Sequence, residues 1–161
     1  MGEEAKSKIM EMPLQQRLKY GYKKVLDMLL VSGGISIVAI LLVYFGENAN
    51  IIPPFTCDYG CNVKVGNNTV INHSGVFLDT NEINIGKHAL IGPKSGLYGA
   101  IHPFDVEARN EGIEKAKTIN IGDGAWLGGK VTVVPGVSIG KHSVIGAGSV
   151  AVSYTHLRAH E

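Results

Sequence analysis

The sequence predicts an all-β solenoid, a parallel β-helix assembled from six-residue repeats, and two observations lead to this prediction. Aliphatic residues recur every six positions without a break at Ile121, Leu127, Val133, Ile139 and Ile145. Glycine is unusually common, with 21 of 161 residues, whereas only 18% of the residues are charged. A short strand followed by a tight corner takes six residues, so three such units complete one coil of a triangular prism with the aliphatic side chains inside.

The composition excludes several other classes of protein. The chain has 15 basic and 14 acidic residues and a net charge of +1, which leaves no electrostatic footprint for nucleic acid. There is no glycine at every third position, so a collagen-like fold is excluded. Cys57 and Cys61 are too few to cross-link a chain of this size, so we expect a reducing, cytoplasmic location. Their spacing, without a second pair, does not predict a metal site.

Residues 1–50 are predicted to form an N-terminal helical and apolar segment. Over about residues 14–30 the apolar positions, among them Leu18, Tyr22 and Leu26, recur at spacings of three and four, which predicts an amphipathic helix. The helix should end at Ser32-Gly33-Gly34, because glycine pairs disfavour helical backbone.

The uncharged segment 28–45 has two interpretations. Its length reaches the lower limit of a membrane-spanning helix, and the preceding lysines would place the N-terminus inside the cell. Alternatively, a helix ends at Gly33-Gly34 and a buried β-segment follows over 35–45. The glycines and serines argue against a continuous bilayer helix, and membrane contact through 28–45 stays as the alternative.

The repeat domain is predicted over residues 51–151. The six-residue phase is also present in two earlier blocks, Val65, Ile71, Phe77 and Ile85, Ile91, Leu97. Small residues such as Gly86 and Gly92 follow the aliphatic positions, which allows neighbouring coils to pack closely. A β-sandwich would instead show turn signals every 8–12 residues and no strict phase.

The repeat is interrupted at two places. A small bulge separates Phe77 from Ile85, and a polar loop over 103–118 follows His102. An insertion in a solenoid must leave the coil as a loop on one face, so these two places are candidates for function.

Four stretches of the chain carry a family resemblance. They are Pro-Pro-Phe-Thr-Cys-Asp-Tyr-Gly at 53–60, Val-Gly-Asn-Asn-Thr-Val-Ile-Asn at 65–72, His-Pro-Phe-Asp-Val-Glu-Ala-Arg-Asn-Glu-Gly at 102–112 and Ile-Gly-Asp-Gly-Ala-Trp-Leu-Gly-Gly at 121–129. Over residues 53–150 the chain resembles the sugar O-acetyltransferases of the maltose/galactoside acetyltransferase group. The resemblance implies a left-handed β-helix, acetyl-CoA as co-substrate, a sugar acceptor, and a homotrimer with active sites between subunits.

His102 is the predicted general base. A protonated sugar hydroxyl is a poor nucleophile, and imidazole titrates near neutral pH. The resemblance implies that His102 takes the hydroxyl proton while the oxygen attacks the thioester directly, without an acyl-enzyme. Asn72 matches a family asparagine that holds the acceptor or stabilises the oxyanion, although an asparagine stacked at a coil corner is the alternative.

The remaining site residues are predicted in two groups. The resemblance places Asp58, Tyr59 and Asp79 at the sugar, with turn chemistry as the alternative for Asp79 and packing for Tyr59. Small residues and the single tryptophan are predicted to contact acetyl-CoA: Gly92, Trp126, Gly128, Gly129, Ala147 and Gly148. The alternatives are ordinary repeat corners for the small residues and a core position for Trp126.

Two parts of the chain depart from the family. Residues 1–50 are short and apolar where the family has a longer helical cap, so we predict no acceptor residue there and no particular sugar. Residues 152–161 do not match the family and are interpreted as a tail on a truncated frame, which would lack the β-helix and weaken contacts to the phosphates of CoA. A catalytically impaired β-helix scaffold or sugar-binding module is therefore the alternative function, and an acyltransferase acting on an amine or serine is a third.

Overall fold

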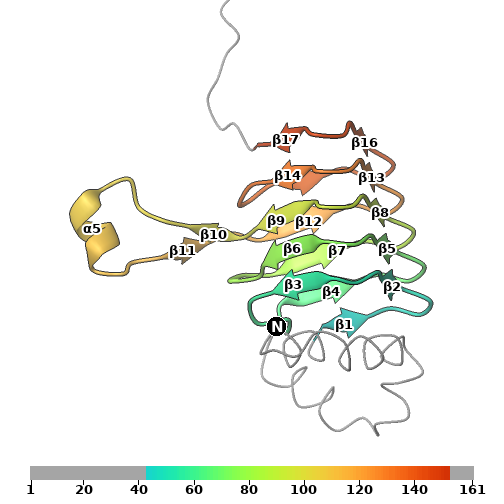
Figure 1. Cartoon of the computed structure of the whole chain (residues 1–161), viewed down its shortest axis with the longest axis horizontal. Coiled ribbons are helices and arrows are strands. Elements are labelled where there is room, and N and C mark those ends of the chain that lie inside the picture. The colour runs from blue at the N-terminus through green and yellow to red at the C-terminus, as the bar shows by residue number, and fades with distance from the viewer. Residues whose placement is uncertain (1–42, 153–161) are drawn as a thin grey trace, which may run out of the picture.

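The chain folds into a triangular prism of five stacked coils (Figure 1). The computed structural model describes residues 43–152. The predicted helix over 14–30, most of the apolar segment 28–45 and nearly all of the predicted tail lie outside these residues. Within 43–152, no helix is long and apolar enough to cross a membrane.

Each coil contributes one strand to each of three parallel sheets, which form the faces of the prism. Face A contains β1 (Tyr44–Phe45), β4 (Val63–Val65), β7 (Ile83–Ile85), β12 (Ile119–Ile121) and β15 (Ser138–Ile139). Face B contains β2 (Asn50–Ile51), β5 (Val70–Ile71), β8 (Leu90–Ile91), β13 (Trp126–Leu127) and β16 (Val144–Ile145). Face C contains β3 (Phe55–Cys57), β6 (Gly75–Leu78), β9 (Gly96–Tyr98), β14 (Thr132–Val133) and β17 (Val150–Ala151).

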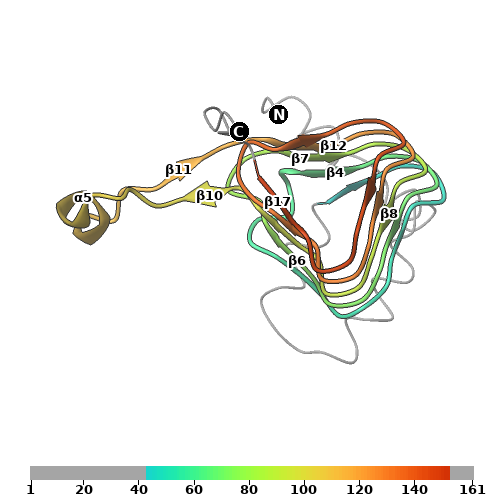
Figure 2. The ribbon, with the colours of Figure 1, turned by 90° about the horizontal axis from the view of Figure 1, so that it is seen from above.

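The coils are stacked in register, and the prism is left-handed, as the resemblance implies. Ile85 pairs with Val65 of the coil before it and with Ile121 of the coil after it. Viewed from above, the chain passes clockwise from face A to face B to face C as it rises toward the viewer (Figures 1 and 2). We call the three edges corner AB, corner BC and corner CA, after the faces that each connects.

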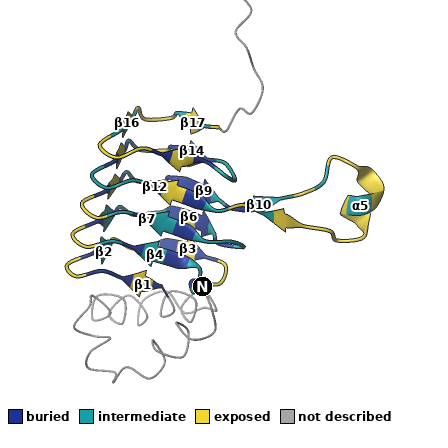
Figure 3. Ribbon diagram, turned by 180° about the vertical axis from the view of Figure 1, so that it is seen from behind, coloured by how far each residue is buried: buried dark blue, intermediate teal, exposed yellow. Residues whose placement is uncertain are grey.

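The six-residue aliphatic series forms the core, as predicted. Ile71, Phe77, Leu97, Leu127 and Val133 are completely buried, and the buried residues run through the interior of the prism (Figure 3). Val43 and Phe45 are also buried, so within residues 43–152 the solenoid already includes β1, which precedes the predicted boundary at residue 51. Ile145, in the last coil, is only partly buried.

Gly92 shows why small residues follow the aliphatic positions. A Cβ at Gly92 would lie 2.6 Å from both the carbonyl oxygen of Gly128 and the backbone nitrogen of Gly129. These are backbone atoms of the next coil, which cannot move aside without separating the coils. Glycine is therefore required here by the close approach of two chains.

Replacing Gly92 by alanine should destabilise the fold by about 1–3 kcal/mol, because the new methyl group overpacks the contact between two coils. Gly140→Ala is the matched control: its Cβ would meet only the Ser143 hydroxyl, at 3.4 Å, and should change stability by less than about 1 kcal/mol. Denaturant titration of both variants at one protein concentration measures the difference. Equal stabilities would contradict the role assigned to Gly92.

A long arm leaves the prism at corner CA, in the region predicted as the loop 103–118 (Figure 2). It consists of an antiparallel pair, β10 (Ala100–Ile101) and β11 (Lys115–Ala116), and a short helix, α5 (Val106–Asn110). The Asp105 side chain accepts a hydrogen bond from Ala108 N at 2.8 Å and caps the helix. None of the residues of α5 is buried.

Candidate functional site

A groove of about 520 Å³ runs along face B and corner BC. Four outward-facing residues of the strands line one side of it: Val70, Leu90, Trp126 and Val144. Residues that follow these strands at corner BC line the other side, among them Asn72, Gly92, Gly128, Gly129 and Ala147. The structure thus brings five of the six predicted acetyl-CoA residues together with Asn72.

The geometry of the groove follows from strand alternation. In each face-B strand the second residue points into the core, so the first residue points outward. Trp126 is 52% exposed, which does not match the alternative of a core tryptophan. Gly148 is not among the lining residues; it follows Ala147 and adopts a left-handed backbone conformation with φ of +75°.

Asn72 presents a free donor beside the groove. Its side-chain oxygen accepts a hydrogen bond from His73 N at 2.8 Å. Its side-chain nitrogen has no hydrogen-bond partner among residues 43–152. An amide N–H at this position can donate to an oxygen that carries negative charge.

His102 and the predicted sugar residues lie together at a different corner. His102 directly follows β10 at the base of the arm, and its side chain is exposed. Asp58 and Tyr59 are exposed in the turn after β3, which belongs to the same corner CA. Because Asn72 and the groove belong to face B and corner BC, one chain does not bring His102 to the groove (Figure 2).

The electrostatic surroundings of corner CA are acidic. Asp58 loses part of its hydration, and the negative charges of Asp79 and Glu114 act in the same direction, so the pKa of its carboxyl is raised. The arm touches this corner through Glu114, whose carboxylate accepts a hydrogen bond from the Thr80 hydroxyl at 3.4 Å. The small bulge and the large insertion therefore meet at one place.

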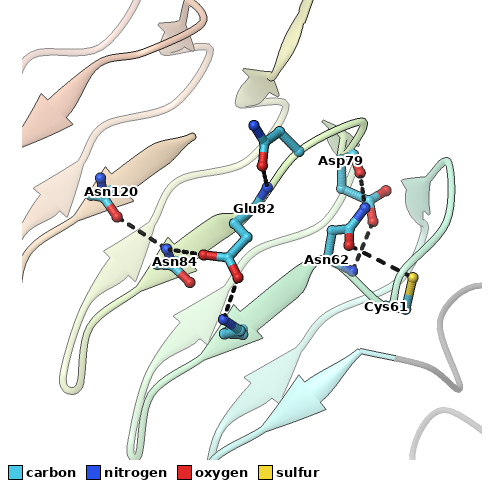
Figure 4. A network of polar contacts seen from close by, with 8 residues as sticks. Cys61, Asn62, Asp79, Glu82, Asn84 and Asn120 are labelled. Carbon is cyan, nitrogen blue, oxygen red and sulfur yellow. Dashed lines mark hydrogen bonds and ion pairs between the residues drawn. The ribbon is translucent and has the colours of Figure 1, made fainter. Parts of the chain in front are cut away.

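Asp79 does not have the position predicted for a sugar ligand. It is completely buried, and its carboxylate accepts hydrogen bonds from the backbone N–H groups of Asp58, Tyr59 and Asn62. A side chain enclosed in this way cannot contact a sugar. The direct role predicted for Asp79 is therefore wrong, and the alternative of turn chemistry describes its contacts (Figure 4).

The Cys57 thiol is buried beside two carboxylates. Burial raises the pKa of the Cys57 thiol to about 12, and the charges of Asp79 and Asp58 and the Cys61 thiol add to this effect. The Cys57 thiol therefore stays protonated and is a poor nucleophile at neutral pH. Among residues 43–152, no group of three or more potential ligands could hold a metal ion.

A polar network on face A was not predicted from the sequence. The Lys64 ammonium lies 2.7 Å from the Glu82 carboxylate, and Asn84 donates to Asn120 at 3.1 Å (Figure 4). The hydrogen bond from Lys64 lowers the pKa of Glu82, with a further contribution from Asn84. The sequence feature that could have predicted this network is the polar residue before an inward-pointing aliphatic residue on this face, as in Asn84-Ile85 and Asn120-Ile121.

Comparison with known proteins gives a consistent set of relatives. The family described as "Bacterial transferase hexapeptide (six repeats)" matches residues 118–151. A Saccharomyces cerevisiae protein named "Putative acetyltransferase YJL218W" is 49% identical over 106 residues. The match covers 66% of this chain and 54% of that protein. The chain spans about half the length of the curated relatives it matches.

Three solved structures share the fold. The hexapeptide-repeat acetyltransferase VCA0836 of Vibrio cholerae, in complex with acetyl-CoA, has a TM-score of 0.71 and 32% identity, covering 85% of this chain and 77% of that one. A maltose O-acetyltransferase of Clostridium difficile has a TM-score of 0.68 and 35% identity, covering 84% and 76%. A galactoside acetyltransferase in complex with coenzyme A has a TM-score of 0.66 and 32% identity, covering 86% and 72%.

Proposed function

The chain belongs to the hexapeptide-repeat acetyltransferase family, and we propose that it transfers an acetyl group from acetyl-CoA to a hydroxyl group of a sugar. The observation that carries the proposal is the groove on face B, which Trp126 lines on one side and Asn72, Gly92 and Gly128 line on the other. Two relatives of the same fold have acetyl-CoA or coenzyme A bound.

The groove suits the long, thin pantetheine arm of acetyl-CoA. Its walls are the apolar side chains of face B, and glycines at corner BC allow a ligand to approach the backbone. The half-exposed Trp126 ring offers a flat apolar surface at the middle of the face. Gly148 directly follows the lining residue Ala147, and we assign it to the part of acetyl-CoA that Ala147 contacts.

The sugar is assigned to corner CA. The Asp58 carboxylate accepts hydrogen bonds from sugar hydroxyls, and the exposed Tyr59 ring offers an apolar face to the sugar ring. The names of two structural relatives, a maltose and a galactoside acetyltransferase, favour a sugar over an amine or a serine as acceptor.

His102 and Asn72 share the chemical step. His102 takes the proton of the sugar hydroxyl as the hydroxyl oxygen attacks the thioester carbonyl carbon, and the new C–O bond forms. The Asn72 amide N–H donates to the oxyanion of the tetrahedral intermediate. The intermediate collapses by breaking the C–S bond, and the sulfur of CoA receives the proton held by His102.

We propose a homotrimer in which each active site is shared by two subunits. Within one chain His102 and Asp58 lie at corner CA, whereas Asn72 and the groove lie along face B and corner BC. A neighbouring copy that places its corner CA against this groove brings the general base and the sugar residues next to Asn72 and the acetyl-CoA site. Light scattering of the purified chain should therefore give three times the mass of one chain, and a stable monomer with full activity would contradict the shared site.

The test of the proposed function is an assay of the purified full chain with acetyl-CoA and a panel of maltose, glucose and galactosides. We expect sugar-dependent release of the CoA thiol, with an acetylated sugar detected by mass spectrometry. Calorimetry with CoA decides between the enzyme and the scaffold. No detectable binding at millimolar CoA would contradict the proposal and favour a β-helix scaffold or sugar-binding module.

A further inference from the structure

We propose that Asp79 is a positioning residue for the sugar: its buried carboxylate fixes the turn 58–62 and thereby sets where Asp58 and Tyr59 meet the acceptor. The inference rests on the proposed function and deepens it. It concerns a residue that touches no substrate and acts through two residues that do.

The contacts of Asp79 cover most of the turn. One carboxylate oxygen accepts hydrogen bonds from Asp58 N at 3.0 Å and Tyr59 N at 2.9 Å. The other accepts from Asn62 N at 3.3 Å, and the Asn62 side-chain amide donates to the backbone oxygen of Asp79 at 2.7 Å. The two ends of the turn are therefore tied to a single residue of the next coil. Figure 4 shows the contacts between Asn62 and Asp79.

The arrangement determines the direction of the two exposed side chains. Because the N–H groups of Asp58 and Tyr59 both point inward to one oxygen, their backbone orientation is fixed. Tyr59 is 55% exposed, whereas Gly60, the next residue, is buried with φ of +72°. The turn thus presents Asp58 and Tyr59 to solvent while its backbone is held from below.

Only a carboxylate satisfies all three donors. An ionised carboxyl group has two acceptor oxygens, and its charge strengthens each hydrogen bond from a backbone N–H. An asparagine of the same size has one acceptor oxygen, and its NH₂ group would face the remaining N–H donor. Asp79→Asn therefore preserves the volume but releases one end of the turn.

Asp79 also influences Asp58 electrostatically. The charges of Asp79 and of Glu114 on the arm both raise the pKa of the Asp58 carboxyl, after the effect of lost hydration. A more basic carboxylate is a better acceptor for a sugar hydroxyl. Removing the charge of Asp79 should therefore lower the pKa of Asp58, a change that a purely steric role would not produce.

The test compares Asp79→Asn with Asp123→Asn in the full chain. Asp123 is a matched control, because its carboxylate also accepts a backbone N–H across coils, from Lys87 at 3.1 Å, but at corner AB. We expect Asp79→Asn to raise the KM for the sugar by about 10-fold or more and to leave the KM for acetyl-CoA within about twofold. Asp123→Asn should change neither. An equal rise in both KM values, or an unchanged sugar KM, would overturn the inference.

Two measurements keep the inference testable apart from the sugar assay. Nuclear magnetic resonance should show faster amide exchange at Asp58, Tyr59 and Asn62 in Asp79→Asn, and a lower pKa for the Asp58 carboxyl. If the wild-type chain acetylates no sugar, the proposed function fails, and these readouts still decide whether Asp79 holds the turn. Unchanged exchange and an unchanged Asp58 titration would overturn its positioning role.

If Asp79→Asn does not fold, Asn62→Ala replaces it as the test. This variant removes the hydrogen bond from the Asn62 amide to the Asp79 backbone oxygen and, on the other side, the acceptor of the Cys61 thiol, while the Asp79 carboxylate stays in place. We expect a several-fold higher sugar KM with an unchanged acetyl-CoA KM. A sugar KM equal to that of the wild type would count against the proposal.

Discussion

Replacing His102 by alanine is expected to lower kcat for acetyl transfer by about 10²- to 10⁴-fold, the usual contribution of a general base. The affinity for CoA should change little, because the substitution leaves intact the residues that line the groove on face B, among them Trp126 and Gly92. Steady-state kinetics with a saturating sugar, together with calorimetry of CoA binding, separate these two effects.

Two further variants show whether the loss comes from proton transfer. His102→Gln keeps a polar side chain of similar length but cannot take a proton, so its kcat should fall as far as that of His102→Ala. Glu107→Ala, at an exposed position of helix α5 on the same arm, should keep kcat within about threefold of the wild type. Equal kcat values for wild type and His102→Ala would exclude His102 as the base.

Replacing Phe77 by alanine should cost about 3–5 kcal/mol of the free energy of unfolding, because a large cavity opens at the centre of the prism. Phe77 is completely buried, and its ring meets that of Phe55 edge-to-face with centroids 4.9 Å apart. Loss of this aromatic pair adds to the loss of buried area. Denaturant titration at a fixed protein concentration measures the effect, because assembly would also contribute to stability.

The control for this prediction is on the same strand. Val76 points outward from β6 and is 37% exposed, so Val76→Ala should change stability by less than about 1 kcal/mol. If both variants lost the same stability, β6 would not have the alternation that the structure gives it. The pair therefore tests the assignment of inward and outward faces.

The core could be predicted because it depends on the phase of the repeat, and the same phase arranges the residues that line the groove. Residues six apart occupy equivalent places in successive strands, and residues eighteen apart lie on the same face, so Leu127 and Ile145 both point inward from face B. The residue after each of them, Gly128 or Gly146, then stands at corner BC. Residues one full coil apart thus lie along one line of the prism, and predicting one position predicts its neighbours in the stack.

Corner CA could not be predicted in the same way, because the phase is lost there. The bulge after β6 and the arm after β10 change the number of residues between strands. The hydrogen-bond partners of Asp79 lie 17 to 21 residues away, and no fixed spacing identifies them. Whether a carboxylate near a bulge faces solvent or the backbone depends on burial, which the repeat does not determine at this corner.

The attachment of the arm has a consequence for how such proteins can diversify. Lys117 N donates to Gly99 O at 2.9 Å, and Gly99 N donates to Leu78 O at 2.9 Å, so the two ends of the arm are held together at the surface of the prism. Above and below this junction, β7 and β12 still pair in full register. The stacking of the coils thus does not depend on the segment inserted between residues 99 and 117. Arms of other lengths and sequences could therefore be accommodated at this position without changing the prism.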